Sequence, residues 1–390
     1  MRACNLTGQI ITAVRSVVPD ASVPLHEPFF GGNEWDYVKE CLDSGWVSSV
    51  GAYVDRFEEA LAVFTGARRA VAVVNGTAAL HVCLQLVGVE YGDEVLIPAL
   101  TFVGTANAVV YCGAVPHFVD SSEQTLGIDS IRLEEYLSEI AEIGDQGCYN
   151  RITGRRIRAV IPMHVFGHPV DLDPLLAVCA RYRLELVEDA AESLGSYYKG
   201  RHTGTFGRCA ALSFNGNKII TSGGGGAILT NDDELAQAAK HLTTTAKLPH
   251  RWELNHDRIG YNYRLPNINA ALGCAQLELL PMFVAQKRAL AQSYLTAFDG
   301  IEEVCFFKEA CFSRSNYWLN ALLLHDAVVD RRDDVLHACN QAGIMARPAW
   351  TPLNRLPMFA GCPRMALDVA ENLAARIVNI PSSAVLGARS

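Results

Sequence analysis

The chain has 390 residues, of which 50% are hydrophobic and 19% are charged, and 33 lysines and arginines against 42 aspartates and glutamates give a formal net charge of −9. This length predicts two or three lobes around a large core, and the composition argues against a disordered protein. The acidic balance excludes a general nucleic-acid-binding protein, because phosphate contacts need a basic surface.

The first predicted element is a short amphipathic helix over residues 9–18. Polar residues interrupt its apolar content, so it does not have the pattern of a signal peptide. No run of about 18 apolar residues follows, and we therefore expect a soluble, cytoplasmic protein that does not span a membrane. The 12 cysteines never form Cys-x-x-Cys, which favours reduced thiols over a disulfide framework or a zinc site.

Short apolar runs then alternate with longer amphipathic ones, a pattern typical of an α/β layer architecture. The predicted strands are residues 70–74, 94–98, 115–119, 158–162, 184–188, 210–213 and 227–230. The predicted helices are residues 77–89, 105–112, 130–143, 173–182 and 233–242. Seven strands joined by helical crossovers predict a mostly parallel sheet that is covered on both faces.

The pattern changes after residue 270. A helical stretch over residues 268–298 contains Pro281, which we expect to kink or divide it. A strand-like run at 318–324 and a helix at 332–342 predict a smaller α+β lobe. The predicted organisation is an N-terminal segment with a helix at 33–44 that packs on the small lobe, a large domain and a small C-terminal domain, spanning residues 1–50, 51–270 and 271–390.

The first candidate site residues follow the strand predicted at 70–74. Gly76 and Thr77 stand where this strand gives way to a helix. The free N–H groups of a first helical turn and the positive end of the helix dipole favour an anion such as phosphate. Gly76 permits close approach and the Thr77 hydroxyl adds a donor. The alternative is a capped helix that binds no ligand.

A carboxylate follows the strand predicted at 184–188. Asp189 stands at the carboxyl end of this apolar strand, where open α/β sheets place their ligands. A partly desolvated carboxylate favours a cationic partner, and a protonated ring nitrogen would serve. The alternative for Asp189 is the N-cap of a following helix.

A lysine, Lys218, lies between the strand predicted at 210–213 and the four glycines at 223–226. Burying a charged lysine in such an apolar place costs free energy unless the amine is neutral, paired or covalently bonded. A deprotonated lysine forms Schiff bases with aldehydes. The alternative is an ammonium group that reaches solvent from a turn. The glycines precede a strand, so they do not form a dinucleotide-binding turn, and the residues around Lys218 lack P-loop spacing.

In this order, the three features describe the protein side of pyridoxal phosphate chemistry. A helix N-terminus takes the phosphate, an aspartate holds the ring nitrogen, and a lysine bonds to the aldehyde. We therefore expect pyridoxal 5′-phosphate as the cofactor, with Lys218 and Asp189 as the catalytic residues.

Further motifs carry a resemblance to a known family. They include LTFVGTAN at residues 100–107, GTFG at 204–207 and GYNYR at 260–264. With these motifs the chain resembles the sugar aminotransferases of the DegT/DnrJ/EryC1/StrS family over about residues 24–383. The resemblance implies the type I aspartate-aminotransferase fold, in which a large domain with a mostly parallel seven-stranded sheet is joined to a smaller C-terminal α+β domain.

The resemblance also implies a reaction. The segments SFNGNKII at residues 213–220 and SNYW at 315–318 are similar to the branch that aminates C4 of a nucleotide-linked 4-keto-6-deoxy-N-acetylglucosamine, in legionaminic acid or bacillosamine biosynthesis. The implied function is transfer of an amino group from glutamate to a UDP- or GDP-linked keto sugar for cell-surface glycans. The alternatives are an aminotransferase for another keto sugar or a cyclitol, and a non-catalytic regulatory protein that binds pyridoxal phosphate.

Roles at the cofactor are implied residue by residue. Phe102 is expected against the pyridine ring, Glu192 beside its ring oxygen, and Asn262 at the phosphate of the neighbouring subunit's cofactor. The last role implies a homodimer with shared active sites. The implied cofactor-binding residues are Gly76, Thr77, Phe102, Asp189, Glu192, Ser213, Lys218 and Asn262.

The substrate is expected to meet four further residues. These are His164, which follows a strand, Ser48 in an N-terminal loop, Lys247 in a basic cluster and Trp350. Each has an alternative interpretation: His164 could be hydrogen-bonded within the protein, and Ser48 could only stabilise a turn. Lys247 could be a solvated surface cation, and Trp350 could belong to the core of the small lobe. We expect no metal, because Gly167 and Pro169 exclude the helix on which His164 and His168 could form a metal-binding pair.

Overall fold

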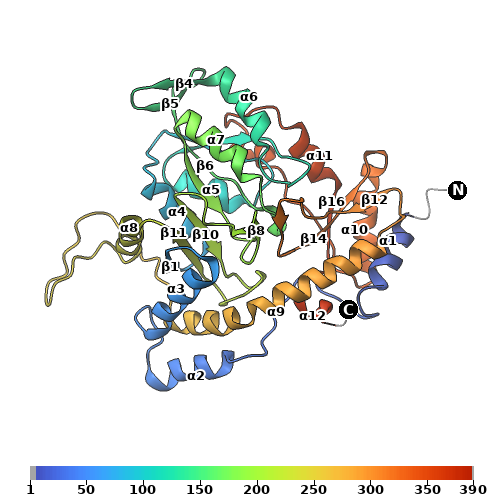
Figure 1. Cartoon of the computed structure of the whole chain (residues 1–390), viewed down its shortest axis with the longest axis horizontal. Coiled ribbons are helices and arrows are strands. Elements are labelled where there is room, and N and C mark those ends of the chain that lie inside the picture. The colour runs from blue at the N-terminus through green and yellow to red at the C-terminus, as the bar shows by residue number, and fades with distance from the viewer. Residues whose placement is uncertain (1–5, 389–390) are drawn as a thin grey trace.

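The computed structural model describes residues 6–388, and a large sheet with helices on both faces forms its centre (Figure 1). The sheet has the order β1-β11-β10-β7-β6-β2-β3, with the β4–β5 hairpin attached beside β6. Strand β11 runs antiparallel to β1 and β10, and the other neighbours along this path are parallel. Its strands are β1 Arg69–Val73, β2 Glu94–Pro98, β3 Val115–Val119, β4 Ala141–Gly144, β5 Gly147–Asn150, β6 Arg156–Val160, β7 Glu185–Asp189, β10 Cys209–Ser213 and β11 Gly226–Thr230.

All seven predicted strands are present, and the prediction of a mostly parallel sheet is confirmed. Successive residues of a strand point to opposite faces, and the strands β1, β10 and β11 contribute in this way to two cores. In β1, Val71 and Val73 belong to the core beneath α4 and α8, whereas Ala70 and Ala72 belong to the core beneath α3 and α9. Apolar residues at every position, rather than at alternate positions, are what a strand covered on both faces requires.

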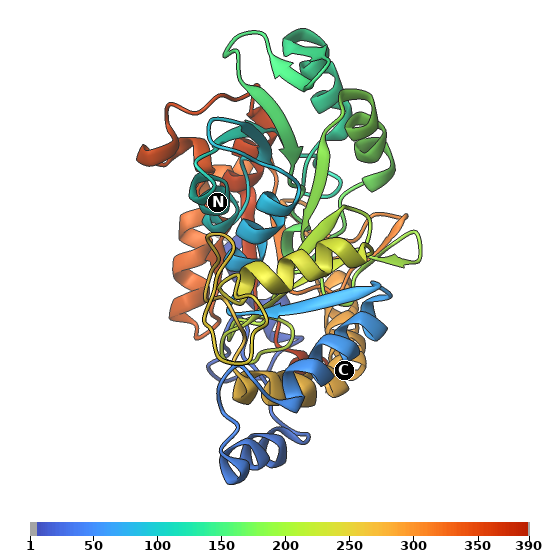
Figure 2. The same ribbon diagram turned by 90° about the vertical axis from the view of Figure 1, so that its left-hand side faces the viewer.

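The helices of this region cover the two faces. Figure 2 shows β1 between α8 on one side and α3 on the other. Side chains of Asn75, Asp129 and Asp232 accept N–H bonds at the starts of α4, α6 and α8, which fixes where these helices begin. The helices are α3 Ala52–Thr65, α4 Gly76–Leu86, α5 Val103–Tyr111, α6 Ser130–Ile140, α7 Leu172–Tyr182 and α8 Asp233–Thr243.

Helix α6 ends three residues before the predicted boundary at 143. Residues from Ala141 pair instead with β5 in an antiparallel hairpin, which takes the backbone groups that a longer helix would have used. Cross-strand pairing therefore overrides the helical pattern of the sequence at this point.

A second, smaller sheet lies near the C-terminal end of the long helix α9, Asn267–Ala297 (Figure 1). Its four strands are antiparallel in the order β12-β14-β16-β15. The elements of this region are β12 Val304–Phe306, β14 Asn320–Leu324, α10 Arg332–Gln341, β15 Arg347–Pro348, α11 Asp368–Arg376, β16 Ile377–Ile380 and α12 Ala384–Gly387. The short elements are β8 Tyr197–Tyr198, β9 Arg201–His202 and β13 Ser313–Arg314, which form a third sheet, and the 3-10 helices Val165–Gly167, Asp326–Arg331, Leu353–Arg355 and Pro357–Phe359.

Helix α9, Asn267–Ala297, joins the two regions, and Pro281 lies inside it. The expected division at Pro281 is wrong, because α9 is one continuous helix of 31 residues, and the expected kink remains a prediction. A proline removes one backbone donor and crowds the carbonyl group four residues before it, and packing against α2, α3 and α12 offsets that cost. In the described part of the chain, α9 is the helix that by length and composition alone could cross a membrane, and 56% of its apolar stretch is buried inside the protein.

The N-terminal residues pack in two places. Helix α1, Leu6–Arg15, contributes Leu6, Ile10 and Val14 to the core of the small sheet. Helix α2, Glu34–Ser44, lies instead on the first half of α9, where Glu34 accepts a hydrogen bond from Gln276 at 2.7 Å. The expected packing on the small lobe therefore describes α1 and not α2.

A buried lysine ties the segments around the second half of α9 together. The Lys287 ammonium is fully buried and donates to the carbonyl oxygens of Trp318, at 3.1 Å, and Ser382. Burial lowers the pKa of Lys287 to about 7, since a desolvated ammonium is disfavoured. Within residues 6–388 no carboxylate forms an ion pair with this ammonium, so neutral carbonyl oxygens compensate its charge.

Lys287 predicts a pH dependence of stability. Below pH 7 the lysine is protonated in both the folded and unfolded states, and its burial cost is fully present. Above about pH 7 the folded state releases the proton first, so the free energy of unfolding rises with pH, by up to about 1.4 kcal/mol per pH unit. We expect urea unfolding between pH 7 and 8.5 to show this slope in the wild type and a smaller slope in Lys287→Met. Lys308→Met, at an exposed lysine, is the matched control and keeps the wild-type slope. Equal slopes in all three proteins would contradict the prediction.

Candidate active site

A cavity of about 320 Å³ opens at the carboxyl edge of the large sheet. Gly76 follows β1, Phe102 follows β2, and Asp189 and Ser213 are the last residues of β7 and β10. Because these four strands run in the same direction, their ends meet at one edge, where α/β sheets bind ligands. The lining residues are Asn75, Gly76, Thr77, Leu80, Phe102, Gly104, Thr105, Asp189, Ala191, Glu192, Ser213, Asn215, Asn217, Lys218, Gly224, Gly225, Trp318 and Trp350.

One corner of the cavity is built to receive an anion. The Asn75 side chain accepts the Ala78 N–H at 2.8 Å and the first intrahelical bond runs from Ala79 to Asn75, so the N–H groups of Gly76 and Thr77 precede the helical ladder. Ser213 lies directly beside them, since a Cβ on Gly76 would meet the Ser213 Cβ at 3.1 Å. The structure thus brings together the three residues expected to hold phosphate.

Asp189 supplies negative charge to the cavity. It is 3% exposed, and its carboxylate accepts the Thr105 hydroxyl at 2.7 Å and the Ala191 N–H at 3.2 Å. Burial raises the pKa of Asp189, whereas these two donors and the nearby charge of Lys218 oppose the increase. Both donors are neutral, so the carboxylate is oriented without being neutralised.

Lys218 and Glu192 face each other in the cavity. The Lys218 Nζ lies 3.1 Å from Glu192 Oε1, and the backbone N–H of Phe166 donates to Glu192 Oε2 at 2.9 Å. Burial raises the pKa of Glu192 to about 7, although the charge of Lys218 works in the opposite direction. The amine of Lys218 therefore stands in the cavity with a carboxyl group that titrates near neutral pH.

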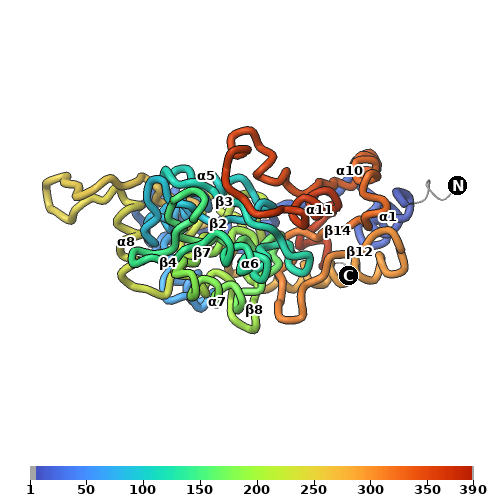
Figure 3. The backbone as a smooth tube through the Cα atoms, turned by 90° about the horizontal axis from the view of Figure 1, so that it is seen from above, coloured from blue at the N-terminus to red at the C-terminus, as the bar shows by residue number. Residues whose placement is uncertain are grey.

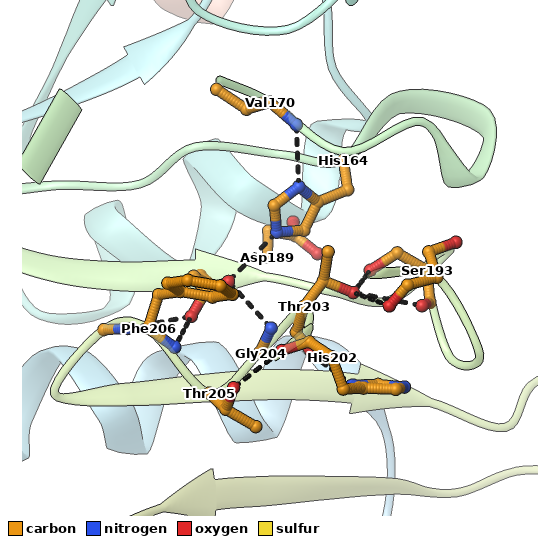
Figure 4. Close-up of polar contacts among 12 residues, drawn as sticks. His164, Val170, Asp189, Ser193, His202, Thr203, Gly204, Thr205 and Phe206 are labelled. Carbon is orange, nitrogen blue, oxygen red and sulfur yellow. Dashed lines mark hydrogen bonds and ion pairs between the residues drawn. The ribbon is translucent and has the colours of Figure 1, made fainter. Parts of the chain in front are cut away.

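His164 lies inside the protein beside Glu188 and not in the cavity. Its Nε2 is 3.1 Å from Glu188 Oε2. Its Nδ1 accepts the Val170 N–H at 3.2 Å, as Figure 4 shows. The ring is fully buried. The expectation that His164 contacts substrate is corrected here, because both nitrogens are used within the protein and the ring does not line the cavity.

Glu188 explains the position of His164. Its carboxylate also accepts the backbone N–H groups of Gly204, Phe206 and Gly207, at 2.7 to 2.8 Å. Burial alone would raise the pKa of Glu188, but the bonds from His164 and from this backbone loop hold it below its usual range. Glu188 thereby fastens the loop at 204–207 to the strand that carries Asp189.

Aromatic side chains line the rest of the cavity. Phe102 is 51% exposed and stands at the N-cap of α5, which leaves its ring free to lie against a planar ligand. Trp350 lines the cavity and stacks on Phe166 with ring centroids 5.1 Å apart. Trp318, for which the sequence suggested no role, also lines the cavity, as does Thr105. Both belong to motifs that carried the family resemblance.

Three expected site residues lie outside this chain's own cavity. Ser48 is exposed, and its carbonyl oxygen accepts the N–H of Asn267. Lys247 and Asn262 belong to the arm, residues 244–262, which projects from the body (Figures 1 and 3). The arm is held by bridges between Thr244 and Asn262 and between Lys247 and His256. The roles expected for these three residues remain predictions.

The arrangement fits pyridoxal 5′-phosphate. The cavity offers free amides beside Ser213 for a phosphate, a buried carboxylate for a protonated ring nitrogen and an amine for an aldehyde. Glycine is required at this corner, because a Cβ on Gly226 would lie 2.5 Å from the Asn75 carbonyl carbon and 2.8 Å from the Gly76 nitrogen.

Comparisons with known proteins agree with this geometry. A model of the DegT/DnrJ/EryC1/StrS aminotransferase family matches residues 30–389. The GDP-perosamine synthase of Caulobacter vibrioides is 37% identical over 362 residues, which cover 92% of this chain and 92% of that protein.

Solved structures share the fold. PseC of Helicobacter pylori, an aminotransferase involved in the biosynthesis of pseudoaminic acid, is similar with a TM-score of 0.84 and 25% identity, over 93% of this chain and 94% of that chain. The aminotransferase TlmJ of Streptoalloteichus hindustanus gives a TM-score of 0.83 and 27% identity, again over 93% and 94%. The expected type I aminotransferase fold is confirmed.

The tight glycine corner predicts a selective effect on cofactor binding. In Gly226→Ala, the new methyl group pushes the Asn75–Gly76 peptide away, and we expect the affinity for pyridoxal 5′-phosphate to fall by about tenfold or more, since such overpacking costs roughly 1–3 kcal/mol. Equilibrium dialysis of the apoprotein with the cofactor measures this. Gly216→Ala is the matched control, because a Cβ added there would have no heavy atom within 4 Å, and its affinity stays at the wild-type value. Unchanged affinity in Gly226→Ala would contradict the assignment of this corner as the phosphate site of the cofactor.

Proposed function

The chain belongs to the DegT/DnrJ/EryC1/StrS aminotransferase family, and from this premise we propose which reaction it catalyses. Its membership makes it a pyridoxal 5′-phosphate-dependent sugar aminotransferase. We propose that it transfers the amino group of glutamate to C4 of a nucleotide-linked 4-keto-6-deoxy-N-acetylhexosamine, in the cytoplasm, for cell-surface glycan biosynthesis. The observation that carries the proposal is the convergence of the Lys218 amine, the Asp189 carboxylate and the Gly76–Thr77 amides on one cavity.

The nucleotide remains a choice between GDP and UDP. The name of the relative from Caulobacter vibrioides identifies a GDP-linked amino sugar as that enzyme's product, which supports a GDP-linked substrate here. The segments around Lys218 and Trp318 resemble the branch that acts on N-acetylated 4-keto sugars, which supports an N-acetylhexosamine. The substrate test therefore varies both the nucleotide and the N-acetyl group of the sugar.

The residues of this chain have distinct roles in the proposed reaction. The bound cofactor supplies an aldehyde carbon that carries the amino group and a ring that takes up an electron pair. Lys218, once its amine is free, removes a proton from the α-carbon of glutamate and delivers it to the cofactor's C4′ carbon, acting as general base and then general acid. For the keto sugar the same amine moves a proton in the opposite direction.

Asp189 keeps the proton on the ring nitrogen throughout. Its charge is buried and preorganised by Thr105 and Ala191, so the charge costs no reorganisation when the ring takes up electrons. Glu192 faces the Lys218 amine at 3.1 Å and accepts a hydrogen bond from it when that amine is released.

We also propose a homodimer with shared active sites. The arm projects from the body of the molecule (Figure 1), and neither Asn262 nor Lys247 lines the chain's own cavity. The arm exposes Trp252 and Ile259 by 75% and 85%. Exposed apolar side chains on a projecting segment are typical of a surface that a partner covers. A second copy of the chain would receive Asn262 at its phosphate corner and Lys247 beside the diphosphate of the sugar nucleotide.

Removal of the amine tests the catalytic assignment. We expect Lys218→Ala to abolish transamination, because no other amine lines the cavity of the described chain. An absorbance band at roughly 410–430 nm that moves to about 330 nm on addition of glutamate marks a working first half-reaction in the wild type. The variant lacks this change. Turnover retained in purified Lys218→Ala would overturn the proposal, and a wild-type band that glutamate leaves unchanged would favour a non-catalytic binding protein.

The substrate is tested with the pyridoxamine form of the enzyme. Loss of the shorter-wavelength band is followed with GDP- and UDP-linked 4-keto-6-deoxy sugars, each with and without an N-acetyl group. The proposal expects the N-acetylated compounds to react fastest. Faster reaction of a sugar without the N-acetyl group would restrict the proposal to the coarser assignment as a sugar aminotransferase.

Shared sites predict complementation between two defective proteins. We expect Lys218→Ala to be inactive and Asn262→Ala to be at least about tenfold less active than wild type. In a mixed dimer, one site regains both wild-type residues, so random mixing restores about a quarter of the wild-type activity. Activity that does not recover when native mass spectrometry shows mixed dimers would contradict shared sites.

A further inference from the structure

The Lys218 amine lies against a second feature besides Glu192. Its Nζ is 4.0 Å from the ring centroid of Trp318, over the face of the indole. The Lys218 side chain is 13% exposed and Trp318 is 4% exposed, so little water lies between the ammonium and the ring. A cation over the face of tryptophan is attracted by the ring quadrupole, and this attraction is largest where water is excluded.

The indole is held in one orientation. Its Nε1–H donates to the carbonyl oxygen of Asn217 at 2.7 Å, and its backbone N–H donates to Asn316 Oδ1 at 2.8 Å. Its carbonyl oxygen accepts the buried Lys287 ammonium at 3.1 Å. Asn217 is the residue immediately before Lys218. The Nε1–H at the edge of the indole therefore fixes the turn that carries Lys218, and the face of the same indole contacts the Lys218 amine.

We propose that Trp318 is a positioning residue for Lys218: its indole face holds the amine released from the cofactor, and holds it most strongly once that amine has taken up a proton and become an ammonium. The proposal rests on the role proposed above for Lys218. During the reaction the amine must leave the aldehyde carbon and later return to it. A fixed aromatic surface confines the released amine to a small volume beside the cavity, which favours rapid return over excursion into solvent.

Several charges share this environment. Glu192 faces the amine directly, Asp189 lies across the cavity, and His26 lies close enough to feel the charges of Lys218 and Lys287. The Trp318→Leu substitution leaves the side chains of Glu192, Asp189, His26 and Lys287 in place. A change in the titration of Lys218 in that variant is therefore attributable to loss of the indole.

The test is the titration of Lys218 in the apoprotein, which does not depend on turnover. Only the neutral amine reacts with acetic anhydride, so competitive labelling from pH 6.5 to 11, read by peptide mass spectrometry, gives the pKa of Lys218. The exposed Lys308 is the internal reference. Because the indole stabilises the ammonium, we expect Trp318→Leu to lower the pKa of Lys218 by roughly 0.5–1.5 units. Trp318→Phe, which keeps a weaker aromatic face, gives an intermediate value.

The matched control is Trp35→Leu, the same substitution at a tryptophan of α2 that is 75% exposed, and it leaves the pKa of Lys218 unchanged. A second measurement alters no side-chain shape: uniform replacement of tryptophan by 5-fluorotryptophan weakens the quadrupole and lowers the same pKa in an intact fold. In the holoenzyme, Trp318→Leu slows the glutamate-driven spectral change with little effect on half-saturation by glutamate.

The outcomes separate the two proposals. A pKa of Lys218 that is unchanged or raised in Trp318→Leu, or unchanged with 5-fluorotryptophan, would overturn the role of Trp318 and leave the proposed function intact. Activity in Lys218→Ala would overturn the proposed function, whereas the apoprotein titration would still report whether the ring holds the amine.

Discussion

Three carboxyl groups, Glu188, Asp189 and Glu192, are buried within five residues of sequence at the end of β7, and the way each is compensated determines the site. A buried carboxylate is costly unless charge or hydrogen bonds offset its desolvation. Glu188 receives His164 and three backbone N–H groups, and Glu192 receives Lys218 and one N–H group. Asp189 receives only the Thr105 hydroxyl and the Ala191 N–H, neither of which can carry a positive charge, and so its charge remains available to a cationic ring nitrogen.

The surrounding fold follows from this requirement. The GTFG loop at 204–207 closes over Glu188 because the carboxylate needs its amides. The short 3-10 turn around Phe166 approaches Glu192 for the same reason. Parallel strands bring the phosphate corner, the ring carboxylate and the lysine to one edge, and tryptophans from the smaller region close the cavity. The catalytic groups are thus arranged by elements that are far apart in the sequence.

Much of this organisation could be predicted from the sequence, for identifiable reasons. Runs of apolar residues bounded by turn residues located seven of the nine strands in the large sheet of the described chain and missed the β4–β5 hairpin. The order of Gly76, Asp189 and Lys218 at strand ends indicated the cofactor. His164 was placed wrongly because a histidine after a strand can face either the ligand or the layer behind, and only the buried Glu188 decides between them. The end of α6 and the unbroken helix at Pro281 depend on pairing and packing partners that are distant in sequence. Trp318 belongs to the SNYW motif at 315–318, but the motif assigned it no role, because its contacts with Asn217 and Lys218 join residues that are distant in sequence.

Helix α9 constrains how such a molecule can admit two unlike substrates. Its 31 residues span about 46 Å, with the first half packed on α2 and α3 and the second on α1 and α12. A single helix that is packed into both halves limits how far they can separate. In the proposed reaction, glutamate and the sugar nucleotide would then enter the same cavity one after the other, and the spent amino donor would have to leave before the keto sugar could bind.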